Sequence, residues 1–288
     1  MANHQESLHF AREWPLWYEP VIAGLVCGLL CALLGLYMLL NRIVFVSLAI
    51  TQSAGLGIFI SFFVAGFWGL SLEHSPLSLL AGLILASSTA FLFVSFRKSQ
   101  KDFDEVLIGL IYIAASGLII FIGDRIAEGK HAIDNLLFGN AVAVTATSLQ
   151  TLTAVTVVAM FVHFFFRREL LYTSADTHFM HVAGLKTNFW LALLYLTLIL
   201  GITISMKTLG TLPVFALMVI PPFIALKRAR GLRDAFLIAL QLGMIIPPLG
   251  YYLSFLFSFP TGASMIVAAL LYVLASLVEP AILRQKRC

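Results

Sequence analysis

Long apolar runs recur along almost the whole of this sequence, and they constrain its fold more than any other feature. A bilayer core of roughly 30 Å is crossed by about 20 apolar residues in a helix. Of the 288 residues, 60% are hydrophobic and only 11% are charged, whereas a soluble domain carries about 25% charge. Lipid must therefore surround most of the chain, which predicts an all-α, polytopic transmembrane helical bundle.

We expect about nine membrane-spanning helices, with eight as the alternative count. The second run is unusually long and the fifth is weak. Leu136–Val144 is apolar but too short to cross, so we expect it to lie at the interface or to re-enter the membrane. The predicted spans are Pro20–Leu40, Val44–Leu70, Pro76–Phe96, Val106–Gly123, Leu149–Phe166, Asn188–Met206, Leu209–Leu226, Ala235–Phe257 and Gly262–Pro280.

Basic residues are distributed unevenly among the predicted loops. If the N-terminus lies outside and the spans alternate, the inside loops hold most of the 18 lysines and arginines. The positive-inside rule therefore favours an outside N-terminus and a cytoplasmic C-terminus. The sequence divides into an extracytoplasmic N-terminal segment (1–19), a single transmembrane domain (20–283) and a cytoplasmic tail (284–288).

Prolines and cysteines stand out within the spans. Pro213, Pro221 and Pro222 in the seventh span predict structural breaks, because proline removes a backbone donor and clashes with the preceding turn. Such breaks either border a water-filled pathway or improve packing. Cys27 and Cys31 share a helix face. They could bind a soft ion, although buried cysteine more often behaves as a small hydrophobe.

Two features that would indicate how a transporter is energised, a phosphate-binding loop for ATP and a charged residue near the middle of a span, are missing from the sequence. The only Gly-Lys pair in the sequence is Gly129-Lys130, and His131 follows it where a Ser or Thr is needed. The sequence therefore has no phosphate-binding loop of the Gly-x4-Gly-Lys-Ser/Thr type. Any ATP hydrolysis would need a separate subunit. No span carries a charge near its centre, which argues against a proton-coupled secondary carrier.

Five segments resemble motifs of the ABC transporter permeases of the zinc/manganese/iron (ABC-3) uptake family, and they occur in the family's order. By this resemblance the chain would be a divergent member. Leu209–Pro222 is similar to the pattern VG-x-LLV-x-ALLIIP-A, and Asp176–Gly184 to D-P-E-x-A-x-x-x-G. Asp104–Gly109 resembles an acidic-pair-x-x-I-G motif. Leu137–Asn140 resembles L-F-G, and Phe259–Gly262 resembles P-x-G.

This resemblance implies a transport subunit rather than an enzyme. It would be the permease of an ATP-binding-cassette importer for divalent metal ions, zinc or manganese first and iron next, working by alternating access. ATP would be hydrolysed on a separate ATPase subunit, and no cofactor would be covalently bound. A solute-binding protein outside the cell, a permease homodimer and the bacterial inner (cell) membrane are also implied, whereas nucleic acid is not.

The resemblance implies a coupling helix in the loop before the sixth span. Asp176 can cap a short helix and Gly184 can end it. His178, Phe179 and His181 would then contact the ATPase. The alternative is an ordinary interfacial helix.

The family places an Asp and, four residues later, a His in the second span. Leu48 and Gln52 occupy these positions here. Gln52 keeps a carbonyl acceptor but lacks the imidazole that zinc favours, so it is only a candidate metal-contacting position. Thr51 and Ser53 are also polar, and we expect this face, Leu48 included, to line the pathway. His163 is expected to be packed or interfacial.

Two other functions remain open. One is an ABC permease that carries a metal chelate or another small molecule, which needs no direct metal ligands. The other is an ATP-independent secondary carrier.

Overall fold

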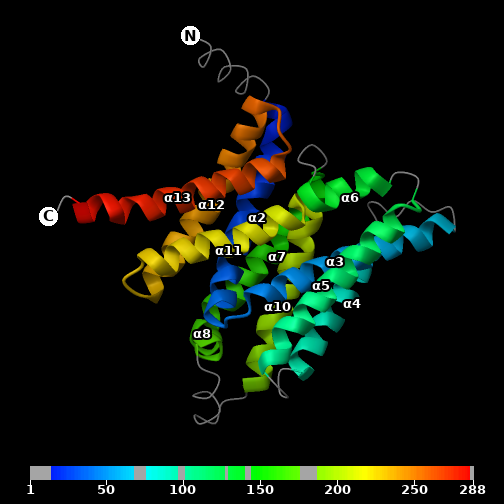
Figure 1. Ribbon diagram of the computed structural model, residues 1–288, viewed down its shortest axis with the longest axis horizontal. Helices are drawn as coiled ribbons and strands as arrows, with labels where there is room; N and C mark the ends of the chain where they lie inside the picture. The colour runs from blue at the N-terminus through cyan, green and yellow to red at the C-terminus, as the bar shows by residue number, and fades with distance from the viewer. Residues whose placement is uncertain are drawn as a thin grey trace.

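A computed structural model of the chain describes residues 14–67, 76–96, 101–126, 129–139, 144–175 and 187–285, with side chains described for slightly shorter parts of these ranges. The described residues form helices and short links, with no strand among them (Figure 1). In chain order the helices are α2 (Trp14–Leu40), α3 (Val44–Phe67), α4 (Pro76–Phe96), α5 (Lys101–Gly123), α6 (Gly129–Phe138), α7 (Ala146–Phe165), α8 (Arg167–Ala175), α10 (Thr187–Leu209), α11 (Thr211–Arg228), α12 (Leu232–Phe257) and α13 (Thr261–Gln285).

Eight of these helices are long and apolar enough to cross a membrane: α2, α3, α4, α5, α7, α10, α11 and α12. They correspond to the first eight predicted spans, which confirms the all-α, polytopic fold. The predicted ninth span, Gly262–Pro280, lies within the 25-residue helix α13. In Figure 1, α13 runs across α12 and extends away from the bundle.

α2 is the centre of the bundle, although it is the first of the described crossings. Of its most apolar 18 residues, 78% are buried, whereas the corresponding shares for α5 and α7 are 17% and 22%. α5 exposes large apolar side chains such as Ile113, Ile120 and Phe121. In a membrane such surfaces face lipid, so α5 and α7 are outer helices and the protein itself encloses α2.

Small residues let the late helices approach α2 closely. Gly28 lies against the backbone of Gly243 in α12, and Gly35 lies against the backbone of Met218 in α11. A side chain at either glycine would collide with the neighbouring main chain, as at small-residue interfaces in other membrane proteins. The core therefore joins the first helix to the last third of the chain.

The prolines of α11 and α12 do not interrupt their helices. α11 continues through Pro221 and Pro222, and α12 continues through Pro247 and Pro248. Pro213 is the third residue of α11, where an N–H has no partner inside the helix and proline is tolerated. The structural breaks predicted at Pro213, Pro221 and Pro222 are therefore absent: α11 is one continuous helix from Thr211 to Arg228.

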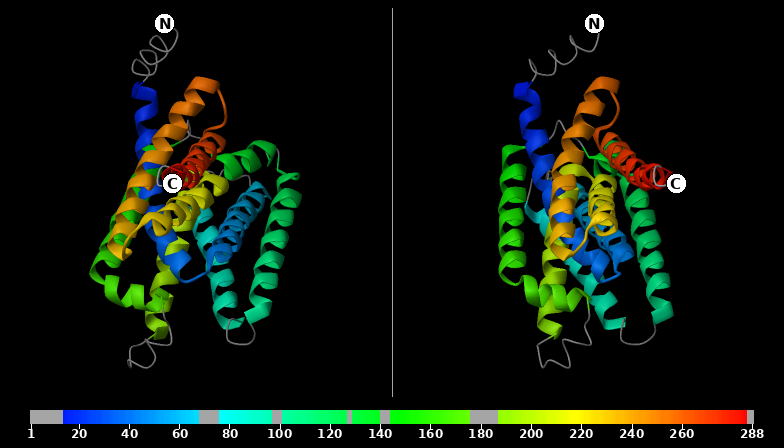
Figure 2. Two further views of the ribbon diagram at one scale, coloured as in Figure 1. Left: turned by 60° about the vertical axis from the view of Figure 1, so that its left-hand side comes forward. Right: turned by 90° about the vertical axis from the view of Figure 1, so that its left-hand side faces the viewer.

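The ends of the helices form two groups (Figure 2). The α2–α3 link, α8 and the α11–α12 link lie toward one end of the bundle, and α6 lies at the other. Arg42, Arg167, Arg168, Arg230 and Arg233 all belong to the first group. This grouping agrees with the loop assignment made from charge, while the side of the membrane that each end faces stays a prediction.

Candidate functional site

The predicted pathway residues lie on α3, at a polar step within an apolar helix. Thr51 Oγ1 donates to the Ser47 carbonyl at 2.5 Å, inside its own helix. Thr89 Oγ1 of α4 donates to Ser53 Oγ at 2.8 Å. Thr51, Gln52 and Ser53 are at most 5% exposed. These side chains therefore face protein rather than lipid.

Gln52 differs from Thr51 and Ser53 in its side-chain contacts. It makes no hydrogen bond to any residue that the structure describes. Leu48, one turn before it, is partly buried. Gly55, three residues after it and on the same side of α3, packs against Leu136 of α6 and Ile119 of α5. A buried amide offers both donors and acceptors to a polar solute, and the pathway role of this face stays a prediction.

Two hydroxyl groups on α10, which the sequence analysis did not single out, belong to the same interior. Thr203 and Ser205 are 0% exposed. The Thr203 hydroxyl oxygen has no hydrogen-bond partner among the described residues, and the Ser205 hydroxyl lies beside Cys31. Thr203 lies where α3 and α4 cross, because a Cβ added at Gly82 would meet its methyl carbon at 3.3 Å and the Ala54 carbonyl oxygen at 3.0 Å. The sequence does carry a signal for them, because Thr203 and Ser205 lie two positions apart in an otherwise apolar span.

His163 of α7 is packed in the core, at 3% exposure. Its Nε2 lies 3.1 Å from Thr197 Oγ1, and that hydroxyl already donates to the Leu194 carbonyl at 2.8 Å. Thr197 must therefore accept, which places the imidazole proton on Nε2. Nδ1 has no partner within the described part of the chain. The ring packs against Tyr37 of α2, with ring centroids 4.5 Å apart.

Three of the sequence motifs meet at one joint near α6. Gly139 and Gly210 have φ angles of 72° and 90°, a region that glycine adopts without the steric cost of a side chain. A Cβ on Gly139 would collide with the Leu209 carbonyl, and one on Gly262 would collide with the Phe138 carbonyl. The end of α6, the α10–α11 link and the start of α13 are therefore in direct main-chain contact.

The predicted ATPase-coupling residues Asp176, His178, Phe179, His181 and Gly184 lie outside the described residues. The two helices that flank them in sequence, α8 and α10, both reach the end of the bundle that carries the basic links (Figure 2).

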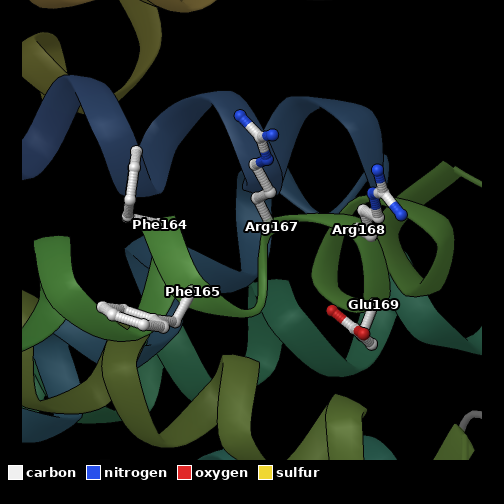
Figure 3. A pocket seen from close by; sticks show the side chains of 5 residues that line it. All are labelled: Phe164, Phe165, Arg167, Arg168 and Glu169. Atoms are coloured by element: carbon white, nitrogen blue, oxygen red, sulfur yellow. The ribbon is translucent and has the colours of Figure 1, made fainter.

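A pocket of about 340 Å³ lies at the α7–α8 corner, near this end. Arg167 and Arg168 point to one side of the chain there, and Glu169 points to the other (Figure 3). The Arg167 guanidinium lies 5.9 Å from the centre of the exposed Phe164 ring. A cationic, aromatic corner of this kind suits the boundary between lipid and water.

Comparison with known proteins connects this arrangement to transport. The model of the ABC 3 transport family matches residues 14–279. The manganese import system permease protein ScaB of Streptococcus gordonii is 22% identical over 280 residues, which cover 96% of this chain and 96% of that protein. The chelated iron transport system membrane protein YfeD of Yersinia pestis is 23% identical over 267 residues, covering 92% and 86%.

A solved structure shares the fold. PsaBC from Streptococcus pneumoniae, in complex with Fab, superposes with a TM-score of 0.80 and 21% sequence identity. The match covers 93% of this chain and 94% of that chain. The helical arrangement described above is therefore shared with a solved structure along nearly the whole length of both chains.

Proposed function

This chain belongs to the ABC 3 transport family, and on that premise we propose that it is the permease subunit of an ATP-driven importer for divalent metal ions. Zinc and manganese are the first candidates, and iron is the next. The observation that carries the proposal is the family match over residues 14–279, which includes all eight candidate spans. The manganese and chelated-iron systems named for the two relatives support a metal cargo.

The buried polar groups on α3, α4 and α10 support a passage through the protein. Thr203 brings an unpaired hydroxyl into an otherwise apolar interior, and the polar side chains of Gln52 and Ser205 are buried there as well. A permease that switches between outward and inward openings needs such groups to replace part of the hydration of its cargo. A passive anchor gains nothing from them, because unpaired buried polar groups cost stability.

The proposal includes partners. ATP binds and is hydrolysed on a separate ATPase subunit, since the sequence lacks a phosphate-binding loop. Two copies of this chain form the membrane part, a solute-binding protein delivers the cargo, and the bacterial inner membrane holds the complex. The segment from Asp176 to Gly184 docks on the ATPase.

The chelate alternative has one specific observation in its favour. Leu48 stands where the family pattern has a carboxylate, and Leu cannot bind a metal ion. A cargo that arrives already liganded would not need that carboxylate.

The decisive experiment is elemental analysis of cells with and without this gene, grown in metal-depleted medium. We expect a selective loss of zinc, manganese or iron that the intact gene restores, but that the gene fails to restore when the partner ATPase is inactivated. Unchanged contents of all three metals, in a strain without other importers, would overturn the metal-ion proposal. Loss of metal only when a chelator is supplied with it would favour the chelate.

A further inference from the structure

Two thiols face each other inside the most buried helix of the protein. Cys27 and Cys31, one turn apart on α2, are 0% and 1% exposed, and their Sγ atoms lie 3.7 Å apart without a disulfide bond. Cys27 lies nine residues after Tyr18 and Cys31 nine before Leu40, the two ends of the span. The pair is thus at the middle of the crossing, the depth at which transporters commonly hold their cargo.

Two buried hydroxyl groups lie close to the thiols. The Ser205 hydroxyl of α10 lies within hydrogen-bonding reach of Cys31. Tyr251 of α12 lies on the Cys27 side, with its ring against Gly24, which shares the Cys27 face of α2. Both residues are 0% exposed, and the Tyr251 hydroxyl oxygen has no hydrogen-bond partner among the described residues. Buried polar atoms are nearly always paired, so the Tyr251 hydroxyl calls for a ligand.

The distance between the sulfur atoms fits a tetrahedral ion. Two thiolates at about 2.3 Å from zinc lie about 3.8 Å apart at a tetrahedral angle. The observed 3.7 Å therefore needs almost no rearrangement of the two thiols.

Charge balance selects a divalent ion. When it binds, two sulfur–metal bonds form and two S–H bonds break, so that M²⁺ + 2 RSH gives M(SR)₂ + 2 H⁺. The product is neutral, whereas a monovalent ion would leave a net negative charge in the membrane interior, which is costly. Thiolates favour zinc and cadmium over manganese, which prefers oxygen ligands.

We propose that Cys27 and Cys31, supported by Ser205 and Tyr251, form a mid-membrane binding site for a thiophilic divalent cation of the zinc group. The inference rests on the proposed function in one respect: the ion reaches this enclosed site when the transport cycle opens the helices. It also names the cargo class, because it places zinc ahead of manganese.

The test is cadmium binding to the purified full chain in detergent, read from the ultraviolet charge-transfer band of cadmium–thiolate bonds. We expect one Cd²⁺ bound per chain, two protons released per ion, displacement by Zn²⁺ and no displacement by equal Mn²⁺. Cys27→Ser and Cys31→Ser should abolish the band. Cys288→Ser, which changes the remaining cysteine, should leave it unchanged. Ser205→Ala or Tyr251→Phe should weaken binding by about tenfold.

Cys27→Ala and Cys31→Ala serve as a second pair if either serine variant misfolds, since alanine adds no buried polar atom. Absence of the band in the wild-type chain, or its persistence in either cysteine variant, would overturn the proposal. If binding is absent but the cells still import metal through this gene, only the thiol site is wrong. If binding occurs but no uptake depends on the gene, the thiol site stands and the importer function is wrong.

Discussion

Some single residues serve the function of a protein at the expense of its stability, and we place Gln52, Thr203 and Ser205 among them. All three are buried, and the Thr203 hydroxyl oxygen has no hydrogen-bond partner among the described residues. Leaving a buried polar group unpaired costs about 1–3 kcal/mol. Apolar side chains of similar size would make a more stable membrane protein, so these polar groups point to contact with something that enters the bundle.

Replacing Gln52 separates its effect on the stability of the protein from its effect on transport. Gln52→Met keeps the side-chain volume and removes the unpaired amide, so we expect the variant to be more stable by about 1 kcal/mol while metal uptake falls. Thermal unfolding of the purified protein and cellular metal content measure the two effects. A lower melting temperature would show that the amide is paired in the native protein. Unchanged uptake would remove Gln52 from the pathway.

His163 should behave in the opposite way, as a packing residue. His163→Ala loses the hydrogen bond to Thr197 and the contact with Tyr37, and we expect a loss of about 2–4 kcal/mol. Phe164→Ala, at the neighbouring position, is the control, because Phe164 is 69% exposed and faces lipid. Equal melting temperatures for the two variants would contradict the core position of His163.

At the scale of elements, the joint near α6 depends on the main chain itself. α6 meets the α10–α11 link and the start of α13 through main-chain contacts at Gly139, Gly210 and Gly262, and the rigid Pro213 ring also packs against Gly262. A contact of this type transmits displacement without slack, since no side chain can rotate to absorb it. We expect these three elements to move together during transport.

Gly139→Ala tests that joint. Alanine pays a steric cost of about 1–2 kcal/mol at positive φ and also collides with the Leu209 carbonyl, so we expect poor expression or a lowered melting temperature. Gly109→Ala is the matched control, because a Cβ there meets nothing within 4 Å. In a helix that change should be neutral or stabilising by up to about 1 kcal/mol. A stable, active Gly139→Ala protein would contradict the joint.

The spans were the most predictable elements, and their contacts were the least. Pro76–Phe96 was predicted with the bounds of α4, because lipid imposes a length and an apolar composition on any crossing. Leu137–Asn140, Leu209–Pro222 and Phe259–Gly262 were recognised as separate motifs. Their meeting depends on long-range packing, which apolar periodicity does not encode. Gln52 could be marked by its polarity alone, whereas the lack of a partner required the neighbouring helices.

At the scale of the whole molecule, the two ends of the bundle should face opposite sides of the membrane. Single cysteines at Arg167 and Asp134, in a variant without the three native cysteines, place one label at each end. A membrane-impermeant maleimide added to intact cells should label Asp134→Cys and not Arg167→Cys, and opened cells should label both. Labelling of Arg167→Cys in intact cells would reverse the predicted orientation.

The burial of α2 has a consequence for synthesis. This helix leaves the ribosome before α11 and α12, yet Gly28 and Gly35 find their partners only when α12 and α11 arrive, roughly two hundred residues later. Until then, a surface shaped to fit protein must rest against lipid or against whatever assists insertion. Completion of the last third of the chain, rather than entry of any one helix, closes the core.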